Sequence, residues 1–397
     1  MEDLSRRLDI KFRIAGGNVM RKAFKGFLVG FLVVAAMTFL VACNNNDNVN
    51  ANQDAEDQRQ YFEVTDLAGN TVQIPEDIQS VVVTSYKGAF EALVLLGRMD
   101  LLAGMCDTSR YAWLLEVYPE LKDVPDYGSF ENVNVEELLK ADVDIIFSPT
   151  EAPEVNEQML SLGMPVYVDG AVNPDEDATF SSQTELLAVA EVIGETDKAN
   201  ELIEWRQGWL DFVAERVADI PEEERKTAIT INESIQQVWN NTYLCGADIE
   251  LAGGINLVAD YFPNTYYGEL SAEELIALDP DFIFQTIGVR EYGDELRGYY
   301  QQLQADERFN GITAIENGDV YIMPYGIAGW DDDYEIGICV VMLAKLMYPD
   351  RFEDVDVWEI AQDFYSRFLG IEITEDDWLF MHQHDFDGAK PLVVYHD

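Results

Sequence analysis

Two glutamates occupy matched positions in a segment that occurs twice in this chain of 397 residues. Residues 134–148 read NVEELLKADVDIIFS, and residues 271–285 read SAEELIALDPDFIFQ. Glu136 and Glu273 fall at the second helical position of each copy, where we expect both carboxylates to face solvent. Such a carboxylate can act through its negative charge. A favourable interaction with the helix dipole is enough to explain one acid at this position. A matched pair is harder to explain by the dipole alone.

The repeated segment predicts a short helix followed by a buried strand. Asn134 and Ser271 are N-cap residues, and a glutamate follows each of them three positions later, as in a capping box. We expect the helices to turn four aliphatic side chains inward, namely Leu138, Leu139, Leu275 and Ile276. The apolar runs 145–147 and 282–284 then read as strands covered on both faces. This unit, repeated along the chain, predicts two similar α/β lobes.

The first 42 residues have the pattern of a secretory signal peptide, with a basic start and a short apolar stretch. Met20 begins a segment of ordinary signal-peptide length, so we interpret residues 1–19 as an upstream extension. The ending Leu-Val-Ala-Cys resembles a bacterial lipobox. It implies a lipid on Cys43 and a location on the outer face of the cytoplasmic membrane or in the periplasm; an anchor that is never cleaved is the alternative. Residues 43–60 are polar and predict a flexible tether.

The chain is strongly acidic and has few histidines. Its formal net charge of -50 excludes nucleic acid as a partner, because phosphates would be repelled. All three histidines lie near the C-terminus, and no zinc-binding, serine-hydrolase or P-loop motif is present. We therefore predict no catalytic residue and no metal site. Cys339 is expected to be a core thiol, and Cys106 and Cys245 are either free or paired with each other.

The rest of the chain divides into two lobes and a connection. We predict an N-terminal α/β lobe over 61–175, linking helices over 176–220, a C-terminal α/β lobe over 221–381 and a tail over 382–397. The linking helices are interpreted as a rigid spine with a break near Gly194. Strands are expected in a hairpin over 61–74 and at 81–83, 101–105, 165–168, 227–231 and 320–323. Helices are expected at 88–97, in the segment 249–259 with an end near Gly253 and Gly254, at 295–304 and within 335–380.

Several short motifs follow one another in a characteristic order. They are VTDLAGNTV at 64–72, LLG at 95–97, YPELK at 118–122, LAGGIN at 251–256 and LAKLMYP at 343–349. Together with the repeated segment, they resemble the substrate-binding lipoproteins of ABC importers for ferric siderophores, haem and cobalamin. The resemblance covers about residues 61–370. Each motif alone is weak, and the order and spacing together make the resemblance specific.

The resemblance implies an α/β fold with two Rossmann-like lobes, a long rigid helix that joins them, and a ligand cleft between the lobes. It also implies a monomeric binding protein without enzymatic activity. Its partners are then an ABC permease dimer with ATPase subunits, a small-molecule ligand, and the membrane through the lipid anchor. In this family, one glutamate on each lobe binds arginines of the two permease subunits. By motif position these glutamates correspond to Glu136 and Glu273.

Aromatic and basic side chains occur in the loops that the resemblance places around the ligand. The candidate ligand-binding residues are Tyr86, Lys87, Arg110, Trp113, Trp239, Tyr243, Tyr267, Arg290 and Trp330. The cations favour an anionic ligand and the aromatic rings a flat chelate, although each cation can instead pair with a local carboxylate. We predict a ferric siderophore-type complex, without a cofactor, and keep cobalamin or haem as alternatives.

Three consecutive acids stand beside one of these candidates, at Asp331, Asp332 and Asp333. We expect them at an exposed helix start, where they complement the dipole. If they face the cleft instead, they weaken the case for an anionic ligand.

Two other classes of protein are alternatives to a binding protein, namely a cell-surface enzyme that uses carboxylates as acid and base and an adhesin lipoprotein. The duplicated unit and the rigid spine argue against both.

Overall fold

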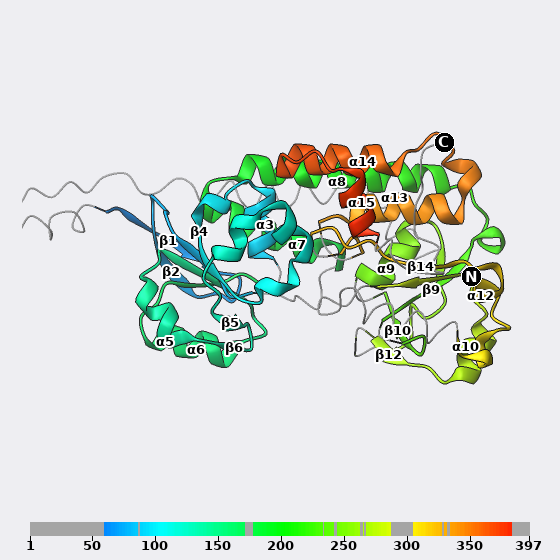
Figure 1. Ribbon diagram of the computed structural model, residues 1–397, viewed down its shortest axis with the longest axis horizontal. Helices are drawn as coiled ribbons and strands as arrows, with labels where there is room; N and C mark the ends of the chain where they lie inside the picture. The colour runs from blue at the N-terminus through cyan, green and yellow to red at the C-terminus, as the bar shows by residue number, and fades with distance from the viewer. Residues whose placement is uncertain are drawn as a thin grey trace, which may run out of the picture. The chain divides into compact units, whose positions relative to one another are not determined.

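The computed structural model describes residues 59–85, 88–170, 178–232, 234–241, 244–262, 265, 267–286, 305–327, 329–331 and 334–382. From residue 59 onward the chain forms an N-terminal and a C-terminal lobe, each built around its own sheet (Figure 1). Within these described residues, no helix combines the length and the apolar character that crossing a membrane requires.

The N-terminal lobe is built on a parallel sheet with the strand order β4-β3-β7-β8. Its strands are β3 (Val81–Val83), β4 (Leu102–Met105), β7 (Ile145–Ser148) and β8 (Val166–Val168). β3 and β7 are buried along their whole length, as the apolar runs predict for a sheet covered on both faces. The helices of this lobe are α3 (Ala89–Leu95), α4 (Ala112–Val117), α5 (Val135–Leu138) and α6 (Pro153–Ser161).

Two small antiparallel pairs accompany this sheet. The predicted hairpin is present as β1 (Tyr61–Thr65) and β2 (Thr71–Pro75). A second pair, which the sequence did not predict, consists of β5 (Gly128–Ser129) and β6 (Asn132–Val133).

The C-terminal lobe has a mixed sheet with the order β12-β10-β9-β13-β14, and β11 pairs with the start of β9. β9, β13 and β14 are parallel, whereas β10 and β12 extend the sheet in antiparallel fashion. The strands are β9 (Thr227–Ile231), β10 (Gln237–Trp239), β11 (Ile255–Asn256), β12 (Tyr267–Glu269), β13 (Phe282–Gln285) and β14 (Val320–Ile322). The helices are α9 (Leu244–Leu251), α10 (Ala272–Leu278), α12 (Thr313–Asn317), α13 (Ile336–Met347), α14 (Val357–Phe364) and α15 (Glu375–Met381).

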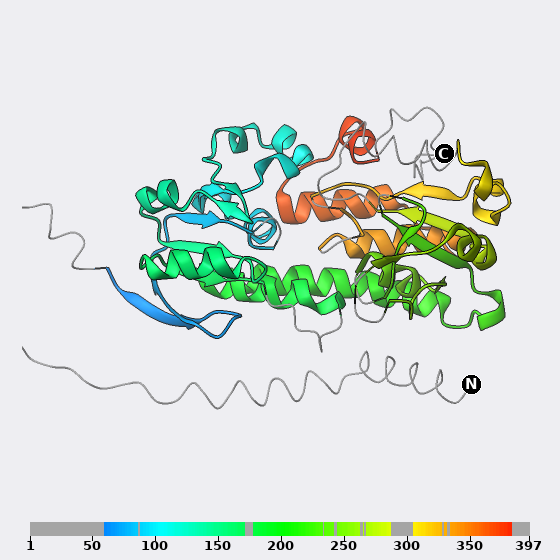
Figure 2. The same cartoon turned by 90° about the horizontal axis from the view of Figure 1, so that it is seen from below.

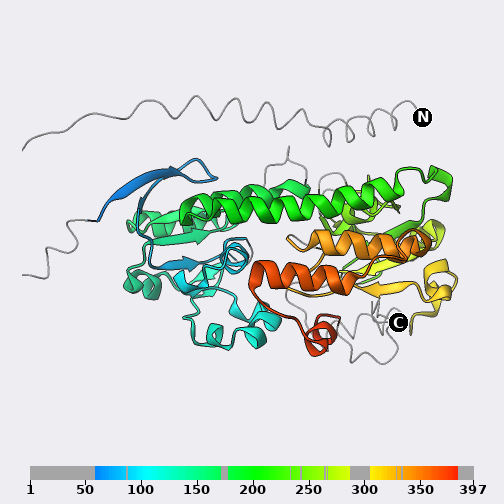
Figure 3. The same cartoon turned by 90° about the horizontal axis from the view of Figure 1, so that it is seen from above.

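Two helices link the lobes, α7 (Ala178–Ile193) and α8 (Thr196–Val217), and they break at the predicted glycine. The start of α8 is tied to the N-terminal lobe by the ion pair Arg98–Glu195, 3.3 Å long. Its end is tied to the C-terminal lobe because Arg216 binds Asp354 at 2.6 Å. Figures 2 and 3 show α8 as one long straight helix, and Figure 3 shows it beside α13 and α14. The connection is therefore the rigid spine that the sequence predicted.

The repeated segment has the same local structure in both lobes. Asn134 and Ser271 each accept a hydrogen bond from the third backbone N–H of their helix, 3.3 Å long in both copies. At the other end, Asp142 and Asp279 both adopt the left-handed conformation, with φ of 47° and 44°. This conformation is costly for a residue other than glycine, and it ends the helical turn in both lobes. The two copies thus begin and end alike.

A reciprocal hydrogen bond then fixes the strand of each copy beside the central strand of its sheet. Asp144 accepts the backbone N–H of Ser80 at 3.1 Å, and Asp281 accepts that of Thr227 at 3.0 Å. The hydroxyls of Ser80 and Thr227 accept the backbone N–H of the same aspartates in return, at 3.0 and 3.1 Å. This pairing sets the register of β7 against β3 and of β13 against β9.

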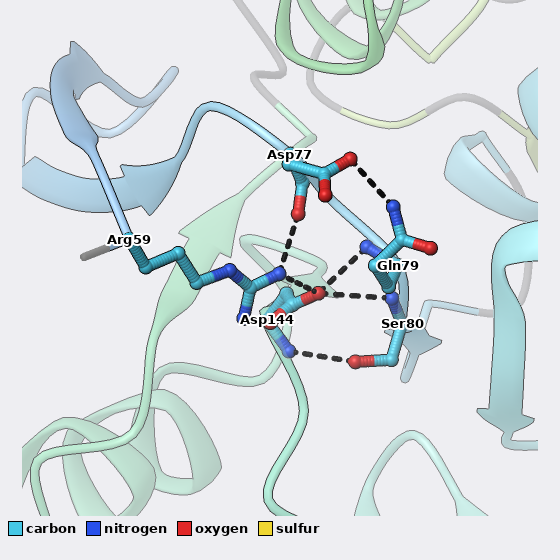
Figure 4. A network of polar contacts seen from close by, with 5 residues as sticks. All are labelled: Arg59, Asp77, Gln79, Ser80 and Asp144. Atoms are coloured by element: carbon cyan, nitrogen blue, oxygen red, sulfur yellow. Dashed lines mark hydrogen bonds and ion pairs between the residues drawn. The ribbon is translucent and has the colours of Figure 1, made fainter. Parts of the chain in front are cut away.

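Arg59 and Gln60 lie at the end of the predicted tether, and both contact the N-terminal lobe. The Arg59 guanidinium forms a two-pronged ion pair with Asp144, and it also donates a hydrogen bond to the carbonyl of Asp77 (Figure 4). The Gln60 carbonyl accepts a hydrogen bond from the backbone of Glu76, 2.9 Å long. The chain therefore joins the folded lobe from Arg59 onward.

One predicted helix has a different start. The helix expected within 249–259 ends close to Gly253 and Gly254, as predicted, but α9 begins at Leu244, and the strand Ile255–Asn256 after it was not predicted. The φ of 88° at Gly253 explains the end of the helix. The other described strands and helices of the prediction are present, while the helix expected at 295–304 lies outside the described residues.

Two of the aliphatic side chains were also assigned to the wrong face. Leu139 and Ile276 were expected to be buried, but they are 46% and 42% exposed. Each helix is so short that only one side can face the core, and Leu138 and Leu275 occupy that side.

The three cysteines of the lobes, Cys106, Cys245 and Cys339, are buried thiols that form no disulfide with one another. Cys339 lies within α13 as a core residue, as predicted.

Candidate functional site

The first candidate residues lie in the segment that follows β4 in the N-terminal lobe. Asp107 adopts a left-handed conformation there, and its carboxylate accepts the backbone N–H of Phe130 at 2.9 Å. The same carboxylate lies 3.5 Å from Nε of Arg110. The guanidinium also stands over the Phe130 ring, 6.0 Å from its centroid. Arg110 is therefore a cation in a nearly buried place, held between a carboxylate and an aromatic ring.

Arg110 also lies where the two lobes meet. The Tyr325 hydroxyl, in the segment after β14, donates a hydrogen bond to the backbone carbonyl of Arg110. Burial, with a smaller effect from the charge of Glu91, raises the pKa of this hydroxyl above its ordinary value. Tyr325 consequently keeps its proton and acts as the donor at neutral pH.

Trp113 and Trp330 come together around Tyr365, but both indoles are buried. Trp113 packs edge-on against the Tyr365 ring with 5.0 Å between centroids, and its Nε1 donates to Asp377 at 3.2 Å. The Trp330 Nε1 donates to the Tyr365 hydroxyl at 3.0 Å, and that hydroxyl donates to Glu335. Trp113 thus connects the N-terminal lobe to C-terminal helices, whereas Trp330 packs within the C-terminal lobe. With 1% and 0% of their surfaces exposed, neither indole presents an open ring to a ligand.

Trp239 and Tyr267 form a separate aromatic pair in the C-terminal lobe. They are directly opposed in the antiparallel register of β10 and β12, and their ring centroids are 5.2 Å apart. Tyr267 is 44% exposed and Trp239 is partly buried. This pair is accessible, unlike Trp113 and Trp330.

Five of the predicted site residues lie outside the described residues, namely Cys43, Tyr86, Lys87, Tyr243 and Arg290. Ser85 immediately precedes Tyr86 and Lys87 in the sequence. Its hydroxyl donates a hydrogen bond to Asp169 at 2.9 Å. Asp169 follows β8 and is wholly buried, and this burial raises the pKa of its carboxyl to about 7. An ionisable acid is therefore hydrogen-bonded to Ser85, the last described residue after β3.

Asp331 does not lie at an exposed helix start, as the sequence suggested, but is buried. Its charge acts on Asp248 of α9, whose pKa is raised well above its ordinary value, first by burial and then by Asp331. Cys339 lies next to Asp248, with 3.8 Å between Sγ and Oδ2. Asp332 and Asp333 lie outside the described residues. The interior of this lobe thus holds two buried acids, Asp248 and Asp331, that interact with each other.

Glu136 and Glu273 are both exposed, as predicted. The side chains of their neighbours, Glu137 and Glu274, form contacts within the same short segments. Glu274 completes the capping box with Ser271, and Glu137 pairs with a lysine one turn later. In the described part of the chain, no hydrogen bond or ion pair involves the side chain of Glu136 or Glu273.

Sequence reasoning missed three residues that shape this region. Tyr365 and Asp377 contact Trp113 from helices that follow it by more than two hundred residues, and no local pattern signals such a contact. Asp169 follows the predicted strand at 165–168 directly. Its position at the carboxyl end of a parallel strand, where ligands of α/β proteins bind, was the available signal.

Comparison with known proteins identifies the family. A family model described as periplasmic binding protein matches residues 81–325. The molybdate-binding protein MolA of Haemophilus influenzae is 24% identical over 334 residues, covering 79% of this chain and 92% of MolA. The solved structure of MolA bound to molybdate has a TM-score of 0.68 at 22% identity, covering 79% of this chain and 99% of that one.

Two further proteins are similar to this chain, one in structure and one in sequence. The crystal structure of a periplasmic solute binding protein from Veillonella parvula has a TM-score of 0.70 at 20% identity, covering 84% of this chain and 100% of that one. A cobalamin-binding protein of Halobacterium salinarum is 26% identical over 231 residues, covering 56% of this chain and 58% of that protein. The two-lobed fold and the match over residues 81–325 agree. The chain belongs to the periplasmic binding protein family and is the substrate-binding component of an ABC importer, not an enzyme.

Proposed function

We propose that the protein captures an anionic metal complex, with a ferric siderophore-type chelate as the leading ligand, and delivers it to the permease of its importer. The position of Arg110 carries this proposal. Arg110 is nearly buried at the junction of the lobes, where little water screens its charge. A cation in such a place attracts charged oxygen atoms more strongly than an exposed one.

The carboxylate of Asp107 offsets part of this charge. Asp107 lies 3.5 Å from Nε of Arg110, so it offsets this charge less than a carboxylate in a short charge-assisted hydrogen bond would. Lys87 and Arg290 complete the proposed cationic set. Trp239, Tyr267, Tyr86 and Tyr243 form its aromatic part, of which Tyr267 has the most accessible described ring. Trp113 is assigned instead to the contact between the lobes, and Trp330 to the core of the C-terminal lobe.

Molybdate is the second candidate ligand, and the similarity to MolA along most of both chains favours it. A small oxyanion requires Arg110 but no aromatic surface. Cobalamin, the ligand in the name of the Halobacterium salinarum relative, requires aromatic surface and few cations. The three ligands therefore differ in which residues they depend on.

We further propose that Glu136 and Glu273 contact the permease during docking. Both carboxylates are exposed at equivalent places of the two lobes, while the Glu274 side chain completes a capping box and the Glu137 side chain pairs with Lys140. Equivalent acids on two lobes suit a permease built from two equivalent subunits, each with a basic contact. Lipid on Cys43, with residues 44–58 as a tether, would keep the protein near the permease.

A panel of candidate ligands tests the proposal. The full mature chain is titrated with ferric siderophores, haemin, cobalamin and molybdate, and binding is followed by tryptophan fluorescence and calorimetry. Arg110→Ala should weaken the binding of a ferric chelate or molybdate roughly tenfold or more. The matched control Lys122→Ala removes an exposed cation of the same lobe and should bind normally. Binding that is indifferent to Arg110→Ala would remove the charge argument.

The aromatic pair then separates the anionic ligands. Tyr267→Ala should weaken a ferric siderophore and leave molybdate unchanged. If only cobalamin binds, and Arg110→Ala has no effect on it, the anionic proposal is wrong and the cobalamin alternative replaces it.

A further inference from the structure

Leu139 and Ile276 are exposed aliphatic residues at equivalent positions of the two copies of the repeated segment. They are 46% and 42% exposed, whereas Leu138 and Leu275, the residues just before them, are buried. A single exposed leucine needs no explanation. The short helices leave both residues outside the core, and because this happens in both lobes, an apolar side chain stands at equivalent points of the two surfaces.

Each of these side chains is a neighbour of one proposed docking glutamate. Leu139 follows Glu136 by three positions, and Ile276 follows Glu273 by three, so each pair shares one face of its helix. The helices are fixed at both ends, by the N-caps at Asn134 and Ser271 and by the left-handed residues Asp142 and Asp279. Each lobe therefore presents a carboxylate and an aliphatic side chain together, on a short and well-anchored element.

The two elements also face the same way. Figure 1 shows α5 and α10 at the lower edge of the molecule, at opposite ends and away from α8 and α14, and Figure 2 looks onto this lower side. A partner that approaches from this side meets both elements at once.

We propose that Leu139 and Ile276 are apolar anchors, which insert into equivalent pockets of the two permease subunits beside the basic groups that receive Glu136 and Glu273. This inference rests on the proposed docking role of the glutamates. Acidic carboxylates on both lobes require basic groups on the partner, which argues against a second copy of this chain, whose net charge is -50. The aliphatic residues would supply affinity, because apolar anchors are desolvated on binding, while the acids supply orientation.

The test uses the full lipid-free mature chain and the importer's own permease–ATPase complex in lipid nanodiscs. Binding to the nanodiscs is measured by interferometry, and coupling is measured as stimulated ATPase activity. Leu139→Ser and Ile276→Ser should each weaken binding about fivefold, since each removes roughly half of a buried aliphatic contact. The double variant should lose more than either single variant. Leu139→Met with Ile276→Leu, which keeps apolar volume at both positions, should bind normally.

Tyr61→Ser is the matched control, because Tyr61 is 55% exposed on the hairpin of β1 and β2, outside the repeated segment. It should bind normally. Normal binding by Leu139→Ser with Ile276→Ser overturns the anchor proposal, and so does a loss confined to one lobe. If this variant binds normally while Glu136→Ala with Glu273→Ala fails, the docking role of the glutamates stands without the anchors. If both double variants bind normally, the docking proposal itself fails. Self-association of the wild-type chain that disappears in the serine variant would identify a second copy as the occupant.

Discussion

The Tyr325 hydroxyl donates a hydrogen bond to the backbone carbonyl of Arg110, and this contact joins the end of one lobe's sheet to the end of the other's. Both residues follow parallel strands, β14 and β4, at the edge where α/β proteins bind their ligands. The contact therefore positions the proposed ligand-binding cation through its backbone. It also links the geometry of the site to the relative placement of the lobes.

Tyr325→Phe should destabilise the protein without creating a cavity. The variant leaves a buried carbonyl without its donor, which typically costs about 1–3 kcal/mol. The urea midpoint should fall while the slope of the transition stays constant. Tyr261→Phe, at an exposed tyrosine, is the control and should behave like wild type. An unchanged midpoint for Tyr325→Phe would mean that the contact contributes nothing to stability.

Arg59→Met should lower stability at neutral pH more than in acid. The Arg59 ion pair and the backbone N–H groups of Gln79 and Ser80 outweigh burial and lower the pKa of Asp144. The folded carboxyl thus has a lower pKa than the unfolded one. Its stabilising contribution is complete above the ordinary pKa of 3.8 and is lost as the pH falls through the folded value.

The difference between wild type and Arg59→Met should therefore be of order 1–2 kcal/mol at pH 7 and shrink below about pH 4. Stability curves from denaturant titrations at several pH values measure it. Arg308→Met breaks the exposed pair with Asp306 and should cost little at any pH. A difference for Arg59→Met that does not change with pH would contradict the role of Asp144.

The sequence predicted much of the fold because the buried strands are long apolar runs bounded by turn residues. The duplicated segment predicted two lobes, and the glutamates at its helix starts are exposed as expected. β10 and β12 were missed because such short antiparallel strands carry no clear alternation. Leu139 and Ile276 were assigned to the core because a helix of one or two turns has too little periodicity to identify its buried face.

The candidate site was predicted less well than the fold. Loop position alone cannot distinguish an aromatic side chain that faces a ligand from one that packs between lobes. Trp113 is buried by Tyr365 and Asp377, which come from distant C-terminal helices. Tyr267, in contrast, belongs to the edge strand of its sheet and stays exposed. Long-range packing decided between these outcomes, and no pattern near either residue carries that information.

Asp169→Asn should change the pH dependence of stability. Burial raises the pKa of Asp169 from 3.8 to about 7, so between these values the folded protein holds a proton that the unfolded chain has lost. This group therefore makes stability fall as pH rises from about 4 to about 7, by up to about 1.4 kcal/mol per pH unit, and adds no slope above that range. Asparagine stays neutral and can still accept the Ser85 hydroxyl, so the variant should lose this decline.

Denaturant titrations of wild type and Asp169→Asn between pH 4 and 8 measure the effect. Asp100→Asn changes an exposed aspartate of the same lobe and should leave the profile as it is. Parallel profiles for wild type and Asp169→Asn would show that Asp169 does not titrate in this range.

Trp330→Phe should reduce stability but not ligand affinity. The variant removes the Nε1 hydrogen bond to Tyr365 and part of a fully buried ring, which should cost roughly 1–3 kcal/mol. Trp239→Ala should do the opposite, with weaker ligand binding and a smaller change in the melting temperature. Calorimetric titration and thermal melts of both variants measure these effects. Weaker binding by Trp330→Phe at unchanged stability would return Trp330 to the ligand site.

Glu136 and Glu273 should matter for transport and not for stability, whereas Glu274 should show the reverse. Glu136→Ala with Glu273→Ala removes two exposed carboxylates that the described fold does not use, so the melting temperature and ligand affinity should stay at wild-type values. Uptake by cells that carry this double variant should be abolished. Glu274→Ala breaks the capping box with Ser271 and should lower the melting temperature slightly, with uptake retained. Normal uptake by the double variant would refute the docking role, and lost uptake in Glu274→Ala alone would show that helix placement, not the free carboxylate, governs coupling.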